Sequence, residues 1–111
     1  MKLKFSRRKR DQRRALLKSL ARELFLREKI KTTQAKAKAL RDFAQRMIEK
    51  SKEKNLNTVR YLRRYFAKDV VKKLVEEIGP RYKERKGGYV KILRLGQRSS
   101  DGAQIFLVKL T

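Results

Sequence analysis

The chain has 111 residues, with 34 Lys and Arg against 11 Asp and Glu, which gives a formal net charge of +23. A folded domain with this excess repels itself unless an anionic partner neutralises it, and nucleic acid fits that need because each phosphate contact releases a counterion. Cys and His are both absent, which excludes a disulfide framework, thiolate or imidazole zinc ligands and a histidine-based hydrolytic triad. No apolar run reaches the length of a membrane span and no signal-peptide core follows Met1. We expect a cytoplasmic protein without a metal or cofactor.

Residues 1–14 form a strongly basic segment with few apolar side chains. Such a segment cannot bury enough apolar surface to offset the entropy lost on ordering, so we expect a disordered arm that orders on RNA or DNA. A solvated, non-specific tail is the alternative. The cationic residues of this arm are Lys2, Lys4, Arg7, Arg8, Lys9, Arg10, Arg13 and Arg14.

Apolar residues at three- and four-residue spacing predict about four helices after the arm. The first spans roughly 13–27, the second 34–52, the third 58–66, and the fourth runs from 69 to a stop at Gly79-Pro80. Each apolar stripe is interpreted as core. Thr32 or Thr33, Asn55 and Asp69 are predicted to cap the second, third and fourth helices. Glu76 and Glu77 are expected to form surface ion pairs with Lys72 and Lys73.

Residues 89–95 and 103–110 are rich in β-branched, aromatic and leucine side chains and are predicted to be strands. Asp101-Gly102 indicates a turn between them, so the simplest pairing is antiparallel. Residues 28–33 are predicted to be a short strand or extended connector that adds to the sheet edge. We therefore expect one α+β domain over 15–111, with helices covering one face of a small two- or three-stranded, mainly antiparallel sheet.

Basic residues gather in three separate segments: the arm, the start of the second helix with Lys31 before it, and residues 81–86. Arginine forks onto phosphate or stacks on bases, and tyrosines among the cations could stack on splayed bases, although Tyr89 at a strand start fits the core better. Gly87 and Gly88 serve either a turn alone or a turn with close RNA approach. Outside the arm, the candidate RNA-binding residues are Lys31, Thr32, Thr33, Lys36, Lys38, Arg41, Arg81, Tyr82, Lys83, Arg85, Lys86, Gly87, Gly88 and Arg98.

Other function classes fit the residues less well. An enzyme lacks a histidine base, and its carboxylates, such as Glu49 and Glu53, lie beside lysines on a helix surface. A membrane-surface binder would want a continuous basic amphipathic helix with free apolar residues, whereas here the apolar stripes are needed for the core. A non-ribosomal, DNA-compacting module stays open as the alternative. The spread of cations over an arm, loops and helix faces favours a folded RNA over a DNA groove.

Three segments resemble the bacterial large-subunit ribosomal protein L17 family. The segment Ile30–Arg41 is similar to its TT-x-x-KAK-x-LR motif, and residues 73–82 together with 85–94, which contain GPRY and RKGGYVKILR, are similar to its other hallmark. Arg13, Ala15, Leu16, Leu17 and Leu20 resemble its opening helix; Gln12 stands where the family has His, and Phe5-Ser6-Arg7 where it has Leu-Gly-Arg. The resemblance implies an α+β structural component of the cytoplasmic large subunit that stabilises large-subunit ribosomal RNA near the polypeptide exit region. Neighbouring ribosomal proteins are the implied secondary partners, and no catalysis, cofactor, membrane or small-molecule substrate is implied.

Overall fold

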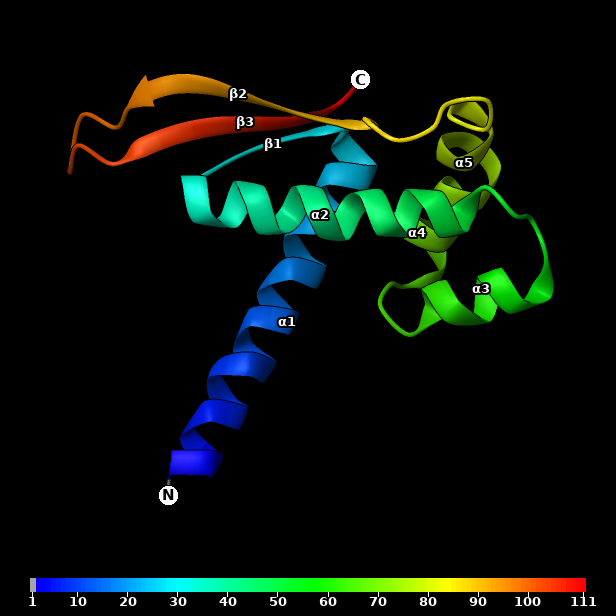
Figure 1. The fold of residues 1–111 in the computed structure, drawn as a ribbon, viewed down its shortest axis with the longest axis horizontal. Helices are drawn as coiled ribbons and strands as arrows, with labels where there is room; N and C mark the ends of the chain where they lie inside the picture. Colours follow the sequence, from blue (N-terminus) through cyan, green and yellow to red (C-terminus); the bar gives the residue numbers. More distant parts are fainter. Residues whose placement is uncertain (1) are drawn as a thin grey trace.

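The computed structural model describes the backbone of residues 2–111 and the side chains of residues 10–111, and it shows an α+β fold (Figure 1). The predicted fold class is therefore confirmed. The elements in chain order are α1 (Lys2–Arg27), β1 (Lys29–Thr32), α2 (Gln34–Ser51), α3 (Leu56–Arg63), α4 (Lys68–Lys73), the π-helix η1 (Leu74–Ile78), α5 (Gly79–Arg81), β2 (Val90–Gln97) and β3 (Gln104–Leu110).

The sheet is three-stranded and antiparallel, with β3 in the centre and β1 and β2 at its edges. This arrangement confirms both the predicted hairpin and the edge strand within residues 28–33. The hairpin closes where Arg98 N donates to the Ala103 carbonyl at 2.7 Å, and Asp101 accepts from Ala103 N at 3.0 Å. Gly102 takes the left-handed conformation there (φ 73°), as the predicted Asp-Gly turn requires.

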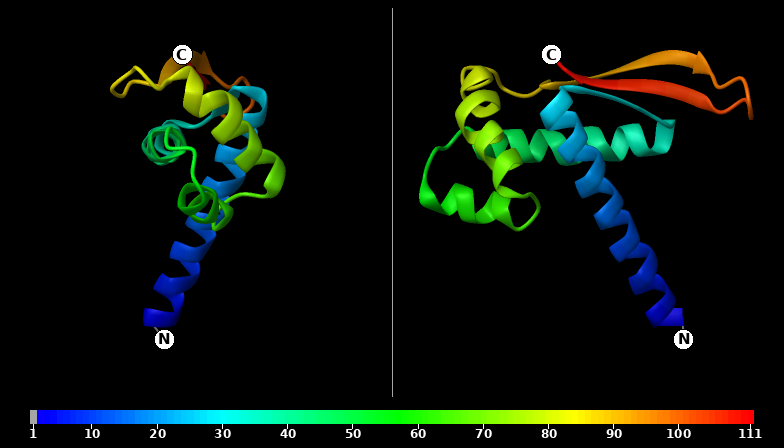
Figure 2. Two further views of the ribbon diagram at one scale, coloured as in Figure 1. Left: turned by 90° about the vertical axis from the view of Figure 1, so that its right-hand side faces the viewer. Right: turned by 180° about the vertical axis from the view of Figure 1, so that it is seen from behind.

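Helices α1 to α4 lie on one side of the sheet, with α2 running along its inner face, and α5 lies beyond the end of the strands (Figures 1 and 2). The apolar stripe predicted for the second helix is buried, from Ala37 and Leu40 to Met47 and Ile48. Val108 and Leu110 of β3 are buried on the same inner face. The core therefore lies between α2, the C-terminal half of α1, α4 and η1, and the sheet.

Helix α1 is longer than the periodicity indicates, because it begins at Lys2 and not near residue 13. The segment expected to be an arm that orders on RNA or DNA has a helical backbone here: it has no Gly or Pro, and Lys, Arg, Leu and Gln favour helix. Its N-terminal half projects away from the rest of the molecule in every view (Figures 1 and 2). The first stripe is consequently only partly core, since Leu16 is 39% exposed while Leu24 and Phe25 are buried.

The fourth helix does not stop at Gly79-Pro80 but continues through η1 and α5 to Arg81. Gly79 has helical φ and ψ of −54°, and its N–H bonds the Leu74 carbonyl five residues back, which is the wide π-type turn. A Cβ built on Gly79 would lie 2.3 Å from the Ser51 carbonyl oxygen. The glycine therefore permits close packing against the end of α2; it does not end the helix.

The predicted caps and surface pairs are partly confirmed. Asn55 caps α3, accepting from Thr58 N at 2.9 Å, and Thr33 is the N-cap residue of α2, although its side chain makes no capping bond. The Asp69 cap is wrong, because α4 begins at Lys68 and its N-cap residue is Ala67, two residues before the predicted cap. The Asp69 carboxylate instead accepts from Val70 N within the first turn at 2.9 Å.

The ion pairs expected between the Glu76-Glu77 and Lys72-Lys73 pairs are also wrong. Lys73 Nζ points to the end of α1 instead. It donates to the Leu26 carbonyl at 2.9 Å and lies 3.3 Å from the carboxylate of Glu28, the residue after the helix. Within the described side chains, Glu76 and Glu77 take part in no ion pair. The wider π-type turn changes the angular spacing of side chains relative to an α-helix, so helical i,i+4 pairing fails across this segment.

Candidate nucleic-acid interface

The three basic segments predicted from the sequence stay apart in the fold. The arm forms the projecting half of α1, whereas the start of α2 and the 81–88 loop lie at opposite ends of α2 (Figure 1). The 18 residues of α2 separate those two ends by about 27 Å. An RNA that contacts all three segments must therefore wrap around the domain or contact it through several separate RNA strands.

The arm presents exposed cations along its described part. Arg10, Arg13 and Arg14 are all exposed on α1. Lys2, Lys4, Arg7, Arg8 and Lys9 belong to the same helix, but their side chains lie outside the described residues. The helical backbone fixes the spacing of successive residues around the helix axis.

The start of α2 presents Lys36 and Lys38 to solvent, whereas Arg41 is half-buried and lies 3.4 Å from the Asp42 carboxylate. Lys31 is exposed on the outer face of the sheet, and Thr32 is buried beneath it. A cation in the first helical turn opposes the helix dipole, so intrahelical stability does not account for Lys36, the third residue of α2.

The 81–88 loop divides into residues with partners inside the protein and residues open to solvent. Arg81 donates to both Glu28 carboxylate oxygens, and Arg85 Nη1 donates to the Thr111 hydroxyl at 2.7 Å. Lys83 and Lys86 are exposed, and neither has an ion pair within the described side chains. These two lysines are therefore the loop's available phosphate contacts.

The loop glycines adopt backbone conformations that other residues rarely take. Gly87 and Gly88 have φ values of 89° and 66°. No atom lies within 4 Å of a Cβ built on Gly87, and only the Arg85 guanidinium reaches 4.0 Å from one built on Gly88. The backbone conformation of the turn, and not close packing, is therefore what requires glycine at these two positions. The open space beside them leaves room for a partner.

Tyr82 and Tyr89 belong to the core and are not surface stacking platforms. They are 3% and 1% exposed, and their rings pack together with centroids 5.2 Å apart. The Tyr82 hydroxyl donates to the Thr111 carbonyl at 2.6 Å. The preference for Tyr89 as core is confirmed, while base stacking by Tyr82 is wrong for this conformation because its ring faces are covered.

A hydrogen-bond network at Tyr89 holds the loop against α2. The Tyr89 hydroxyl accepts from Lys52 Nζ and donates to the Glu49 carboxylate, and Lys52 also donates to the Arg85 carbonyl. The Tyr89 hydrogen bond lowers the pKa of Glu49 below its ordinary value, and the bond from Lys52 to Tyr89 raises the pKa of Lys52. The network fixes where Lys83 and Lys86 are presented.

An aromatic and basic patch that the sequence-based analysis did not select lies between α1, α2 and α3. Tyr61 and Tyr65 are half-buried, with ring centroids 5.6 Å apart. Lys50 lies 5.0 Å from the Tyr61 centroid and Lys18 lies 5.7 Å from that of Tyr65. Burial raises the pKa of Tyr61, so it stays a neutral hydrogen-bond donor. The interleaving of two tyrosines with three arginines in residues 60–65 was the available sequence signal.

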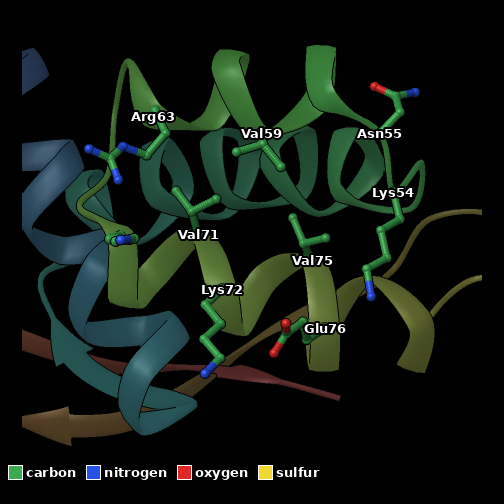
Figure 3. Close-up of a pocket in the computed structure, with 9 residues that line it drawn as sticks. Lys54, Asn55, Val59, Arg63, Val71, Lys72, Val75 and Glu76 are labelled. Carbon is green, nitrogen blue, oxygen red and sulfur yellow. The ribbon is translucent and has the colours of Figure 1, made fainter.

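A groove of about 460 Å³ lies between α3 and the α4–η1 helix (Figure 3). Val59, Val71 and Val75 form its apolar floor, as Figure 3 shows. Its rim carries Lys54, Asn55, Arg63, Lys68, Lys72 and Glu76. The groove lining therefore carries one carboxylate among four cations.

Among the described residues, no three Asp or Glu side chains come together in a way that could hold a metal ion. None of the helices within residues 2–111 combines the length and apolarity needed to cross a membrane. The surface chemistry that stands out is cationic.

Comparison with known proteins assigns the family. The model of the family described as "Ribosomal protein L17" matches residues 16–111. The chain is 45% identical over 101 residues to the "Large ribosomal subunit protein bL17" of Caldanaerobacter subterraneus subsp. tengcongensis, covering 90% of each chain. It is 43% identical over 111 residues to the protein of the same name from Natranaerobius thermophilus, covering 99% of this chain and 98% of the relative. This chain therefore belongs to the ribosomal protein L17 family.

Proposed function

We propose that this protein is a structural component of the cytoplasmic large ribosomal subunit, where it binds and stabilises large-subunit ribosomal RNA near the polypeptide exit region. Its secondary partners are neighbouring ribosomal proteins. Family membership supports this role, because relatives that are 43–45% identical over nearly the whole chain carry the large-subunit name.

The separation of the basic segments is the observation that supports RNA binding best. Exposed cations lie on the projecting α1, at the start of α2 and on the 81–88 loop. A sequence-reading DNA module concentrates its contacts on one recognition element in a groove, whereas a folded RNA offers phosphates on several surfaces at once. The wide spacing therefore fits a protein that holds RNA segments together.

The RNA-contacting set that we propose begins with the arm and the start of α2, then Lys83 and Lys86 of the loop, and Arg98 of the hairpin turn. Arg81, Arg85 and Tyr82 have partners inside the protein. We assign these three a structural role in shaping the loop. Catalysis has no part in the proposal, since the protein's contribution is charge neutralisation and shape.

Filter binding of the purified protein to large-subunit ribosomal RNA tests the proposal. The logarithm of the binding constant should fall linearly and steeply with the logarithm of salt concentration, because several phosphates are neutralised together. Small-subunit ribosomal RNA and duplex DNA of equal length are the controls. Equal affinity for all three would instead support a non-specific DNA-compacting module.

A further inference from the structure

The outer face of the sheet carries a row of three lysines that are direct neighbours across the strands. Lys109 of β3 is paired in register with Lys29 of β1 on one side and with Lys91 of β2 on the other. All three point away from the core, because Val108 and Leu110 on either side of Lys109 are buried on the inner face. Like charges directly opposite one another destabilise a sheet.

The next row on the same face is largely apolar. Leu107 is paired with Leu93 on one side and with Lys31 on the other. At the bulge between Arg94 and Gly96, Leu95 is 50% exposed. Leu95 and Leu107 line a shallow groove of about 580 Å³ together with Lys29, Lys31, Arg27 and Glu23. The face therefore combines an apolar strip with a cationic row.

No helix in the described part of the chain packs across this face, because α2 lies on the opposite side of the sheet (Figures 1 and 2). Helix α1 contributes only Glu23 and Arg27, which line part of the groove. The exposed Leu95 and the half-buried Leu107 lie beside lysines that form no ion pair among the described side chains. This arrangement stabilises neither the sheet nor its solvation. We propose that the outer face binds an acidic segment of a neighbouring protein, with apolar side chains on Leu95 and Leu107 and carboxylates on the Lys29–Lys109–Lys91 row.

Charge and residue type distinguish this occupant from two others. A second copy of the chain would bring a further +23 charges against a basic face, which opposes association. An RNA strand would find phosphate contacts here but no aromatic side chain for its bases, since the apolar strip consists of the exposed Leu95 and the half-buried Leu93 and Leu107. An apolar centre with a charged margin is typical of protein interfaces.

This inference deepens the proposed function, because the partner is met in the assembled large subunit. Leu95 is replaced by a photo-crosslinking amino acid in cells, and incorporation is first measured by sedimentation of the large subunit. If the wild-type protein did not sediment with the large subunit, the proposed function itself would be contradicted. Purified subunits are then irradiated, and the crosslinked product is identified by mass spectrometry.

The expected result is a crosslink from position 95 to a ribosomal protein, at a segment containing Asp or Glu. A matched variant carries the same amino acid at Leu56, which is 62% exposed on α3, and should not reach that segment. A crosslink from position 95 to ribosomal RNA, to a second copy of the chain, to a segment without carboxylates, or to nothing would overturn the inference.

A charge variant supplies the second measurement. Lys29→Gln, Lys91→Gln and Lys109→Gln together should raise the thermal midpoint of the free protein, because cross-strand repulsion is removed. In subunits, the same variant should lower the crosslink yield from position 95 by roughly tenfold, as expected for three lost contacts of a few tenths to one kcal/mol each. Glutamine at the exposed Lys54, Lys68 and Lys72 is the control. An unchanged yield in the sheet variant would overturn the inference.

Discussion

Arg81 binds Glu28 through both carboxylate oxygens, with Nη1 2.5 Å from Oε1 and Nη2 3.1 Å from Oε2. Glu28 directly follows Arg27, the last residue of α1, and takes the left-handed conformation (φ 68°), which is uncommon for a residue with a Cβ. Its backbone carbonyl also accepts from Leu110 N at 3.0 Å. One residue thus links α1, the end of the η1–α5 helix and the central strand.

The first prediction concerns the strength of this pair. Both side chains are more than a third exposed, at 39% for Glu28 and 37% for Arg81, so solvent screens the interaction. A double-mutant cycle with Glu28→Gln and Arg81→Met should give a coupling free energy of about 1 kcal/mol by urea unfolding. Additive effects of the two changes would show that the bidentate geometry contributes nothing measurable.

The second prediction is the acid dependence of stability. Hydrogen bonding from Arg81, followed by that from Lys73, holds the pKa of Glu28 below its ordinary value of 4.5. A lowered folded-state pKa contributes stability that is fully present above pH 4.5 and is lost as pH falls through the folded value. The difference in unfolding free energy between wild type and Glu28→Gln should therefore shrink below pH 4.5. A difference that stayed constant from pH 7 to pH 3 would contradict this assignment.

The third prediction concerns the glycine in the η1–α5 helix. Gly79→Ala places a Cβ against the Ser51 carbonyl, at 2.3 Å before any relaxation, and backbone cannot move aside cheaply. We expect a loss of about 2–3 kcal/mol in unfolding free energy. Gly87→Ala is the matched control, since it has positive φ but nothing within 4 Å of its Cβ, and should cost about 1 kcal/mol. Equal losses in the two variants would remove close packing as the reason for Gly79.

The fourth prediction tests how the 81–88 loop is held. Tyr89→Phe keeps the buried ring but removes the hydroxyl that meets Lys52 and Glu49. Amide hydrogen exchange in residues 83–88 should become faster. The pKa of Glu49 should rise towards its ordinary value, because the hydrogen bond from the Tyr89 hydroxyl, which does most to lower it, is lost. Carboxyl chemical shifts followed by NMR against pH measure the second effect. Unchanged exchange in the loop would mean that packing alone fixes it.

The fifth prediction separates loop residues that contact RNA from those that shape the loop. Lys83→Gln with Lys86→Gln should leave the thermal midpoint near that of wild type and reduce the salt slope of RNA binding by about 1–2. Arg81→Gln should instead lower stability, because Arg81 is bound to Glu28. The opposite pattern, with a stable Arg81 variant of weakened salt slope, would move Arg81 into the interface.

The helices and strands were predictable where local periodicity and tertiary packing agree. The stripe from Ala37 to Ile48 in α2 and the cap at Asn55 needed only spacing and side-chain chemistry. Gly79-Pro80 misled because glycine and proline usually end helices, whereas here the glycine answers a contact with Ser51 that is 28 positions away in sequence. Such a contact leaves no local signal.

The site was predictable as chemistry but not as geometry. Arg81 and Lys83 are both cations of one basic segment in the sequence, and only the fold shows that Arg81 forms an ion pair with Glu28. The row of Lys29, Lys109 and Lys91 depends on strand register, and its paired residues Lys29 and Lys109 are 80 positions apart in the sequence. Single-sequence periodicity gives the face of each strand but not which residues are opposite one another.

Sedimentation of a cell extract through a sucrose gradient tests the central claim most directly, with the protein followed by immunoblotting. The protein should be found with the large subunit and with whole ribosomes at physiological salt. It should move towards the top only in washes of high salt, because phosphate contacts dominate its binding. A protein that stayed at the top of the gradient at low salt, with no share in the large-subunit fraction, would contradict a structural role in the ribosome.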